Sequence, residues 1–177
     1  GGGFGGGGSG GGGRGGGGGR LQLALYYTLY LRDDVLIRSG VPVLDLLNGS
    51  AIGSAGGQSR HAVEAQAGFA NDGFGARLSA NWQSATMVRG GGLDDNLSFS
   101  GLATINLRLF TDLGQQPGLA RRHPWVRGAR VTVALTNLLD SRMHVRDSTG
   151  ITPVSYQPDL LDPLGRTVRI SIRKLFF

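Results

Sequence analysis

Regular alternation of apolar and other residues is the feature that most limits how this chain can fold. Between Arg20 and Leu31, every odd position is leucine or tyrosine, whereas polar residues such as Gln22 and Thr28 stand at even positions. Side chains of a strand point to its two faces in turn, so this period predicts a strand with one apolar face. The period recurs along the chain and predicts an all-β, antiparallel, up-and-down fold of about six strands, at about residues 20–31, 60–69, 74–83, 97–110, 131–140 and 165–177.

Most of these segments are long for strands of a soluble protein. A strand that crosses a membrane in a β-barrel needs about 9–11 residues, whereas strands of soluble proteins typically have about 5–6. A soluble antiparallel sheet with one face in a core also alternates. Aromatic residues near the segment ends favour the membrane barrel, because aromatic girdles mark its two interfaces; these residues are Phe69, Phe74, Trp82 and Phe99.

The C-terminal segment adds terminal aromatic residues to this alternation. Val168, Ile170 and Ile172 share one phase, and Phe176 resumes it after Lys174. The segment resembles the closing strand of a bacterial outer-membrane β-barrel. The resemblance implies that this strand is the signal read by the barrel-assembly machinery, with residues Gly165, Val168, Ile170, Ile172, Phe176 and Phe177.

From about residue 131 onward, the chain resembles the C-terminus of a TonB-dependent receptor. The resemblance rests on Asn137-Leu138-Leu139-Asp140, a loop with Gly150 and Pro153, Gly165-Arg166, and the terminal Phe, which corresponds to Phe176. It implies a barrel of roughly 22 strands with a plug domain in its lumen. It also implies active uptake of a scarce solute, often a ferric chelate, powered through the TonB complex. The smallest barrels have about eight strands, so we expect residues 20–177 to be the C-terminal part of a larger wall.

The expected connections give the strands a direction. Asn71-Asp72-Gly73 is a tight hairpin signal, and in outer-membrane barrels short turns face the periplasm while long loops face outside. With this hairpin in the periplasm, Phe69, Phe74 and Phe176 fall at the periplasmic interface, and Trp82 and Phe99 at the external one. The C-terminus then lies in the periplasm, residues 111–129 form an unusually long periplasmic connection, and the external loops are 32–59, 84–96 and 138–164.

Composition keeps two alternatives open. The net charge of +6 and the pI of about 10.7 suggest nucleic-acid binding, but the arginines form no basic stripe, so we expect no nucleic-acid partner. Residues 1–19 are nearly all glycine and should form a flexible segment, because they cannot bury apolar area to offset their ordering entropy. Arg14 and Arg20 would also suit a soluble β-protein with an RNA-binding glycine–arginine tail. The second alternative is another outer-membrane barrel, such as a porin or an assembly factor.

No catalytic or metal-binding constellation is recognisable, so we expect neither an enzyme nor a cofactor. His61, His123 and His144 lack metal-ligand spacing. The expected partners are outer-membrane lipid, the barrel-assembly machinery and, in the full-length protein, the TonB complex and a plug domain. Polar residues on the inward phase form either a wet face of cross-strand pairs or a lumen that contacts a plug or a solute. They are Glu64, Arg77, Asn81, Asn106, Arg108, Arg169 and Arg173.

Overall fold

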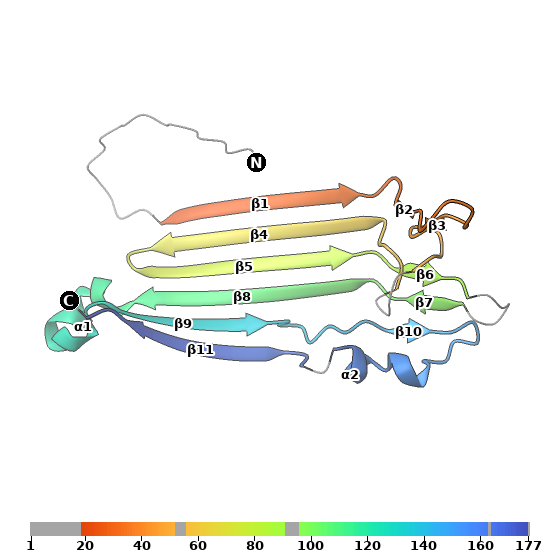
Figure 1. Ribbon diagram of the computed structural model, residues 1–177. Helices are drawn as coiled ribbons and strands as arrows, with labels where there is room; N and C mark the ends of the chain where they lie inside the picture. Colours follow the sequence, from red (N-terminus) through yellow and green to blue (C-terminus); the bar gives the residue numbers. More distant parts are fainter. Residues whose placement is uncertain (1–18, 52–55, 91–95, 163, 177) are drawn as a thin grey trace, which may run out of the picture.

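The chain forms an open antiparallel sheet of six long strands. The computed structural model describes residues 19–51, 56–90, 96–162 and 164–176, so most of the glycine-rich segment 1–19 and Phe177 lie outside the described residues. The predicted all-β fold with six strands is confirmed. Within the described part, the two outer strands pair on one side only and the sheet does not close. The strands follow each other up and down (Figure 1): β1 (Arg20–Leu29), β4 (His61–Asn71), β5 (Phe74–Gln83), β8 (Leu102–Asp112), β9 (Ala129–Thr136) and β11 (Thr167–Lys174).

The shortest connection is the hairpin between β4 and β5. Asn71 and Phe74 are paired, and the two residues between them, Asp72 (φ 43°) and Gly73 (φ 79°), form the turn. Positive φ at both central residues is typical of the hairpin turns whose twist matches that of the flanking strands. The tight hairpin predicted at this position is confirmed.

The other connections gather at the two ends of the sheet (Figure 1). The hairpin lies at the end that we call the turn end, together with the C-terminal residues and the connection η1 (Leu113–Gln115), α1 (Pro117–Arg122) and η2 (Pro124–Val126). The opposite end, which we call the loop end, holds the three long loops. Their elements are β2 (Asp34–Val35), β3 (Leu44–Asp45), β6 (Thr86–Val88), β7 (Leu97–Phe99), β10 (Val145–Arg146), η3 (Val154–Tyr156) and α2 (Pro158–Leu161). The long loops and the hairpin therefore occupy opposite ends, as predicted.

The expected continuous strand at 97–110 is wrong, and so is the outward position expected for Phe99. The chain breaks at Ser100 and Gly101, so that β7 leaves the six-stranded sheet and pairs with β6 and β10 at the loop end. Phe99 is only 1% exposed, and the ring of Tyr156 packs edge-on against it at 5.7 Å between centroids. Alternation alone did not reveal this break. The aromatic ring forms a small core for the loops instead of facing outward.

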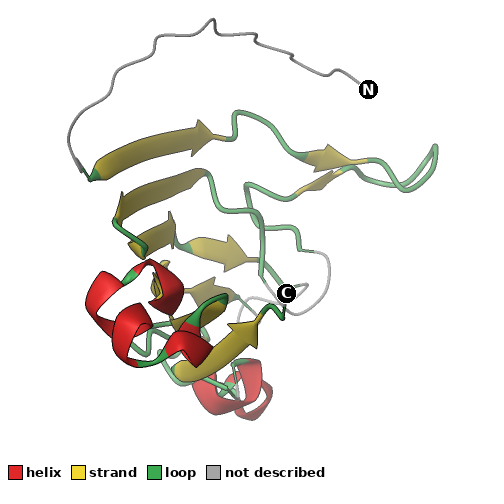
Figure 2. Cartoon of the chain, turned by 90° about the vertical axis from the view of Figure 1, so that its left-hand side faces the viewer, coloured by secondary structure: helices red, strands yellow, loops and turns green. Residues whose placement is uncertain are grey.

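Neither face of the six-stranded sheet is covered by a second layer, because the helices lie at its ends (Figures 1 and 2). On one face, Leu23 is 71% exposed and Ile170 is 69% exposed, and the other face is also accessible. Buried apolar residues of the described part are few, and only the last of the following belongs to this sheet: Phe99, Val126, Val145 and Ala129. The six strands therefore lack the packed second layer that stabilises an ordinary soluble domain.

The ring of Phe110 leaves room only for glycine at position 75 of β5. A Cβ at Gly75 would lie 2.1 Å from Cζ of Phe110, the residue directly opposite in β8. We predict that Gly75→Ala lowers the free energy of unfolding by about 1–3 kcal/mol, the usual cost of overpacking, as measured by urea titration. Gly68→Ala is the matched control, since its Cβ would meet only the Cβ of Gln22, at 3.9 Å. Equal losses in the two variants would contradict the packing argument.

Candidate functional site

The register of the strands places one uninterrupted apolar surface, which we call the apolar face, on one side of the sheet. Its central cross-strand row consists of Leu23, Ala67, Leu78, Leu107, Leu135 and Val168. Residues other than apolar ones occur on this face of the six strands only at or next to strand ends; they are His61, Asn71, Thr111 and Lys174. No charged side chain therefore stands in the middle of the apolar face.

Aromatic side chains lie at both ends of the apolar face. Trp82 and Tyr27 stand in one cross-strand row near the loop end, with Val63 between them. Phe69 and Phe74 lie near the turn end. The four rings are between 40% and 59% exposed. The register agrees with the outward orientation expected for the three predicted residues of this set, while their place at a membrane interface stays a prediction.

The separation of the two aromatic rows can be compared with the thickness of a membrane. Trp82 follows Phe74 by eight residues in β5, which at about 3.4 Å per residue corresponds to about 27 Å along the strand. A strand tilt of about 40° reduces this to a height of about 21 Å. The apolar band of an outer-membrane barrel is about 25 Å tall, so the two rows have nearly the spacing of its two interfaces.

All seven residues predicted to face a lumen lie on the opposite side, which we call the polar face. Glu64 and Asn81 stand opposite each other in β4 and β5. The side chain of Asn106 donates a 3.5 Å hydrogen bond to Ser79 Oγ, and its Oδ1 accepts one of 2.9 Å from the backbone N–H of Asn137. The remaining four, all of them arginines, gather toward the turn end; they are Arg77, Arg108, Arg169 and Arg173. The structure brings the predicted set together on one face without testing its role in a lumen.

A cavity of about 540 Å³ opens at the loop end of the polar face. Ala62, Gln83 and Leu102 belong to the sheet, while Tyr30 and three loop segments, 57–59, 141–143 and 161–162, form the rest of the lining. Its polar groups include those of Arg142 and Asp162. The volume lies in the range of about 300–1,000 Å³ found for ligand sites. Sequence reasoning missed this cavity, because its walls come from segments that no motif connects.

Hydrogen bonds within the loops order this end of the molecule. Asp147 accepts bonds from the Thr149 hydroxyl at 2.7 Å and from the backbone N–H groups of Thr149 and Ile151, both at 2.9 Å. These bonds, with that of the hydroxyl foremost, hold the pKa of the Asp147 carboxyl below its ordinary value. The Asn48 side-chain amide is the main cause of a similarly lowered pKa at Asp45. Both carboxylates therefore order their turns most strongly when ionised.

Two of the segments on which the receptor resemblance rests, 137–140 and 165–166, meet at the loop end of β9 and β11. The strand expected to reach residue 140 ends at Thr136 instead, because Asn137 (φ 51°) and Asp140 (φ 54°) form a turn. The buried Asn137 side chain donates to the carbonyl of Ser141 at 2.8 Å and accepts from its N–H at 2.9 Å. Asp140 Oδ1 accepts the N–H of Arg166 at 2.9 Å. The two parts of the motif, 137–140 and 165–166, thus form one structural unit.

Gly165 is the tightest point of this unit. Its φ is +53°, and a Cβ there would lie 2.7 Å from both Asp140 Oδ1 and Arg142 Nη2. We predict that Gly165→Ala lowers the free energy of unfolding by about 1–3 kcal/mol, the range for a strained backbone residue. In the control Gly150→Ala, φ is also positive (+84°), but no heavy atom lies within 4 Å of the new Cβ. Urea titration of both variants separates the cost of the close contact from the cost of the positive φ. A smaller loss in the free energy of unfolding for Gly165→Ala than for Gly150→Ala would refute the role of the contact.

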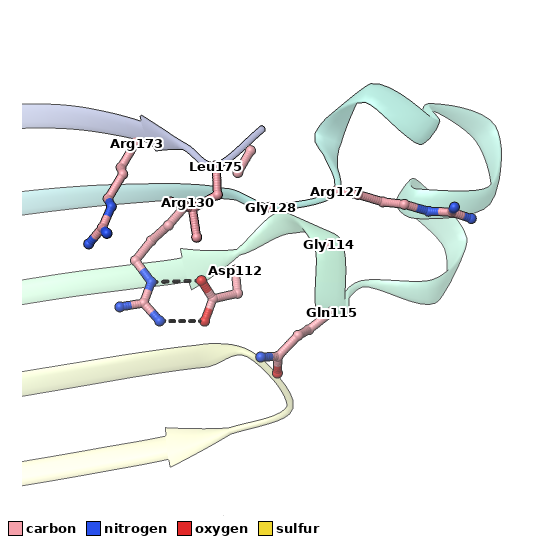
Figure 3. Close-up of a pocket in the computed structure, with 9 residues that line it drawn as sticks. Asp112, Gly114, Gln115, Arg127, Gly128, Arg130, Arg173 and Leu175 are labelled. Carbon is pink, nitrogen blue, oxygen red and sulfur yellow. Dashed lines mark hydrogen bonds and ion pairs between the residues drawn. The ribbon is translucent and has the colours of Figure 1, made fainter. Parts of the chain in front are cut away.

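A second cavity, of about 460 Å³, lies at the turn end and is rich in arginine (Figure 3). Nε and Nη2 of Arg130 donate to the two carboxylate oxygens of Asp112 at 2.6 and 2.8 Å, a bidentate pair. Arg173 stands opposite Arg130 and points along the same wall, whereas Arg127 extends away from both (Figure 3). The one carboxylate in the lining is therefore already paired.

Sequence reasoning missed Trp125 as an aromatic residue of the turn end, whereas it expected Phe176 there. The Nζ of Lys174 lies 5.8 Å from the ring centroid of Trp125 and 5.5 Å from that of Phe176, within the range of cation–π interaction. It also donates to the carbonyl of Trp125. Trp125 is 66% exposed and belongs to η2. Because it precedes β9 in an irregular connection, no alternation could assign it a face.

Among the described residues, no group of three or more His, Cys, Asp or Glu side chains could hold a metal ion. No described helix combines the length and apolar character needed to cross a membrane. In comparisons with known proteins, no family model, curated protein or solved structure matches the chain. Any functional conclusion therefore rests on the residues and their geometry.

Proposed function

We propose that this chain forms part of the wall of a TonB-dependent receptor in the bacterial outer membrane. The observation that carries the proposal is the exposed apolar face, which spans six strands, has no charge in its middle and ends in aromatic side chains at both sides. Apolar surface of this extent on a soluble monomer would mark a liability or an interface. Outer-membrane lipid is the partner that fits a face of this height.

The polar face would then line the lumen, and the loop end would face the outside of the cell. The cavity of about 540 Å³ at the loop end is the candidate position for a solute. The unit formed by 137–140 and 165–166 supports a receptor over a passive porin only through its resemblance to that family. In the full-length protein, a plug domain and the TonB complex would couple uptake of a scarce solute, such as a ferric chelate, to energy.

The absence of cysteine from the chain allows a direct test of the membrane assignment. Leu78→Cys places a single label in the middle of the apolar face, and Ser79→Cys places one at the next position on the polar face. An environment-sensitive fluorophore at position 78 should be quenched by bromine-labelled lipid in vesicles, and the same label at position 79 should not. Equal quenching at the two positions, or a folded monomer in buffer without detergent, would refute a wall in lipid.

A separate measurement tests the receptor assignment. The periplasmic domain of TonB, immobilised on beads, should retain the full-length protein from detergent extracts of outer membranes. A barrel that passes the quenching test but is not retained would be a porin or an assembly factor instead of a TonB-dependent receptor.

A further inference from the structure

The turn-end half of the polar face carries an unusual concentration of arginine. Arg77 in β5 stands directly opposite Arg108 in β8, and Arg169 in β11 occupies the same cross-strand row, with Ala134 of β9 between. We call these three residues the arginine row. Four residues further along the strands toward the turn end, Arg130 stands opposite Arg173.

These charges are not neutralised within the described part of the chain. All three side chains of the arginine row are exposed, and none has an ion pair or a side-chain hydrogen bond to a described residue. The acidic residues on the polar face of the six strands are Glu64 and Asp112. Asp112 is taken by Arg130, and Glu64 stands in a different row, opposite Asn81 and Tyr26.

Such an arrangement is costly unless an anionic partner offsets it. Like charges directly opposite each other in an antiparallel pair destabilise it. Small residues on both sides of Arg77 and Arg108 in the row, Gly68 and Ala134, leave the guanidinium groups accessible from the polar face.

The extent of the charge distribution indicates the kind of partner. From β5 to β11 there are three strand spacings, or about 14 Å, and four residues from Arg169 to Arg173 add about 13 Å along the strand. One small anion contacts only part of such an area, and the row lies on an open sheet surface. A folded protein surface that carries several carboxylates can contact all of it, and arginine binds carboxylates in bidentate geometry.

We propose that the arginine row docks an acidic protein surface inside the barrel, namely a carboxylate-rich face of the plug domain. This inference rests on the proposed function and adds the chemistry of the contact. The guanidinium groups of Arg77, Arg108 and Arg169 pair with Asp or Glu side chains of the plug and thereby fix its position against this wall. Arg130 is already bound to Asp112 and contributes positive potential without being the main contact.

The test uses the full-length protein in the outer membrane, with a photoactivatable cross-linking residue at Ser79, which follows Arg77 by two residues in β5 and is its neighbour on the same face. Mass spectrometry should locate the cross-link in an upstream, Asp- and Glu-rich segment of the same polypeptide. The triple variant Arg77→Gln/Arg108→Gln/Arg169→Gln should lower its yield by about ten-fold or more. The corresponding triple lysine variant should retain most of it, and so should Arg20→Gln, which removes an arginine of the polar face opposite Ala70.

High salt provides a second measurement that needs no substitution. At about 1 M NaCl the Debye length is about 3 Å. In membranes extracted at this salt concentration, the yield of the cross-link in the protein without the arginine substitutions should fall as it does in the glutamine variant. A cross-link to a neutral or basic plug surface, to a different protein, or one insensitive to both salt and the glutamine variant would overturn the inference. Each of these results leaves the receptor proposal standing, whereas a protein absent from the outer membrane would refute that proposal itself.

Discussion

Leu78→Arg should prevent stable insertion of the chain into a membrane, while Ser79→Arg should leave insertion intact. Leu78 stands in the central row of the apolar face, between Ala67 and Leu107. An arginine on the lipid side of a barrel costs about 2–4 kcal/mol at the bilayer midplane, a large fraction of the stability of an ordinary domain. Ser79 is its neighbour in the same strand and points to the polar face, so it controls for the added side chain and charge. The urea midpoint of the protein folded in vesicles measures both effects.

The dependence of this cost on position separates a membrane from a soluble core. Thr111 lies on the same face as Leu78 but next to the turn end of β8. Thr111→Arg should cost only about 0–1 kcal/mol, because the cost of a charge falls toward the interface. In a soluble core the cost would follow burial, and Thr111 is less exposed than Leu78. Equal costs for Leu78→Arg and Ser79→Arg, or a larger cost at Thr111, would refute contact of the apolar face with lipid.

The alternation of residues was sufficient to predict the strands that form the sheet. In β5, β4 and β1 the period of two continues without interruption, so each side chain could be assigned to a face before the neighbours were known. Asn71-Asp72-Gly73 also specified its own turn, since the geometry depends only on residues that tolerate positive φ. Local preference and tertiary pairing agree in this part of the chain.

The predictions failed where an apolar residue serves a local cluster. Phe99 has the phase of an outward residue in a continuous strand, but β7 joins β10, more than 40 residues later, and buries the ring beside Tyr156. Trp125 lies in the connection that was expected on the side of the hairpin, but it has no strand of its own, so its contact with Lys174 was not predicted. Both outcomes depend on contacts between distant segments, which residue periodicity does not encode.

The candidate sites on the polar face show the same limit. Sequence alternation correctly assigned Arg77, Arg108 and Arg169 to one face, but only the register places them in one cross-strand row. A shift of one pairing by two residues would have kept every face assignment and separated the charges. The 540 Å³ cavity likewise depends on how three loops fold over the end of the sheet. Face assignment is thus a property of the sequence, whereas the proximity of functional groups is a property of the fold.

Removal of Phe176 and Phe177 from the full-length protein should strongly reduce its amount in the outer membrane. Phe176 is 86% exposed, and its ring contact in the structure is the cation–π interaction with Lys174. Because the side chain buries so little, its loss should hardly change the stability of the folded sheet. A defect in assembly would therefore indicate recognition of the C-terminal strand by the assembly machinery, and Phe176→Ala should reproduce most of it.

Leu175→Ala is the matched control for this deletion. Leu175 is 46% exposed, lines the turn-end cavity and directly precedes Phe176. Its substitution by alanine therefore removes a similar apolar side chain, but from the opposite phase of the strand. Quantitative immunoblotting of outer-membrane fractions should show near-normal amounts of Leu175→Ala and a several-fold loss for the deletion. Because a stability defect would also appear in protein refolded without the machinery, the urea midpoint of the refolded deletion variant should stay unchanged. Unchanged assembly in cells would show that the final strand forms the edge of this sheet without acting as the assembly signal.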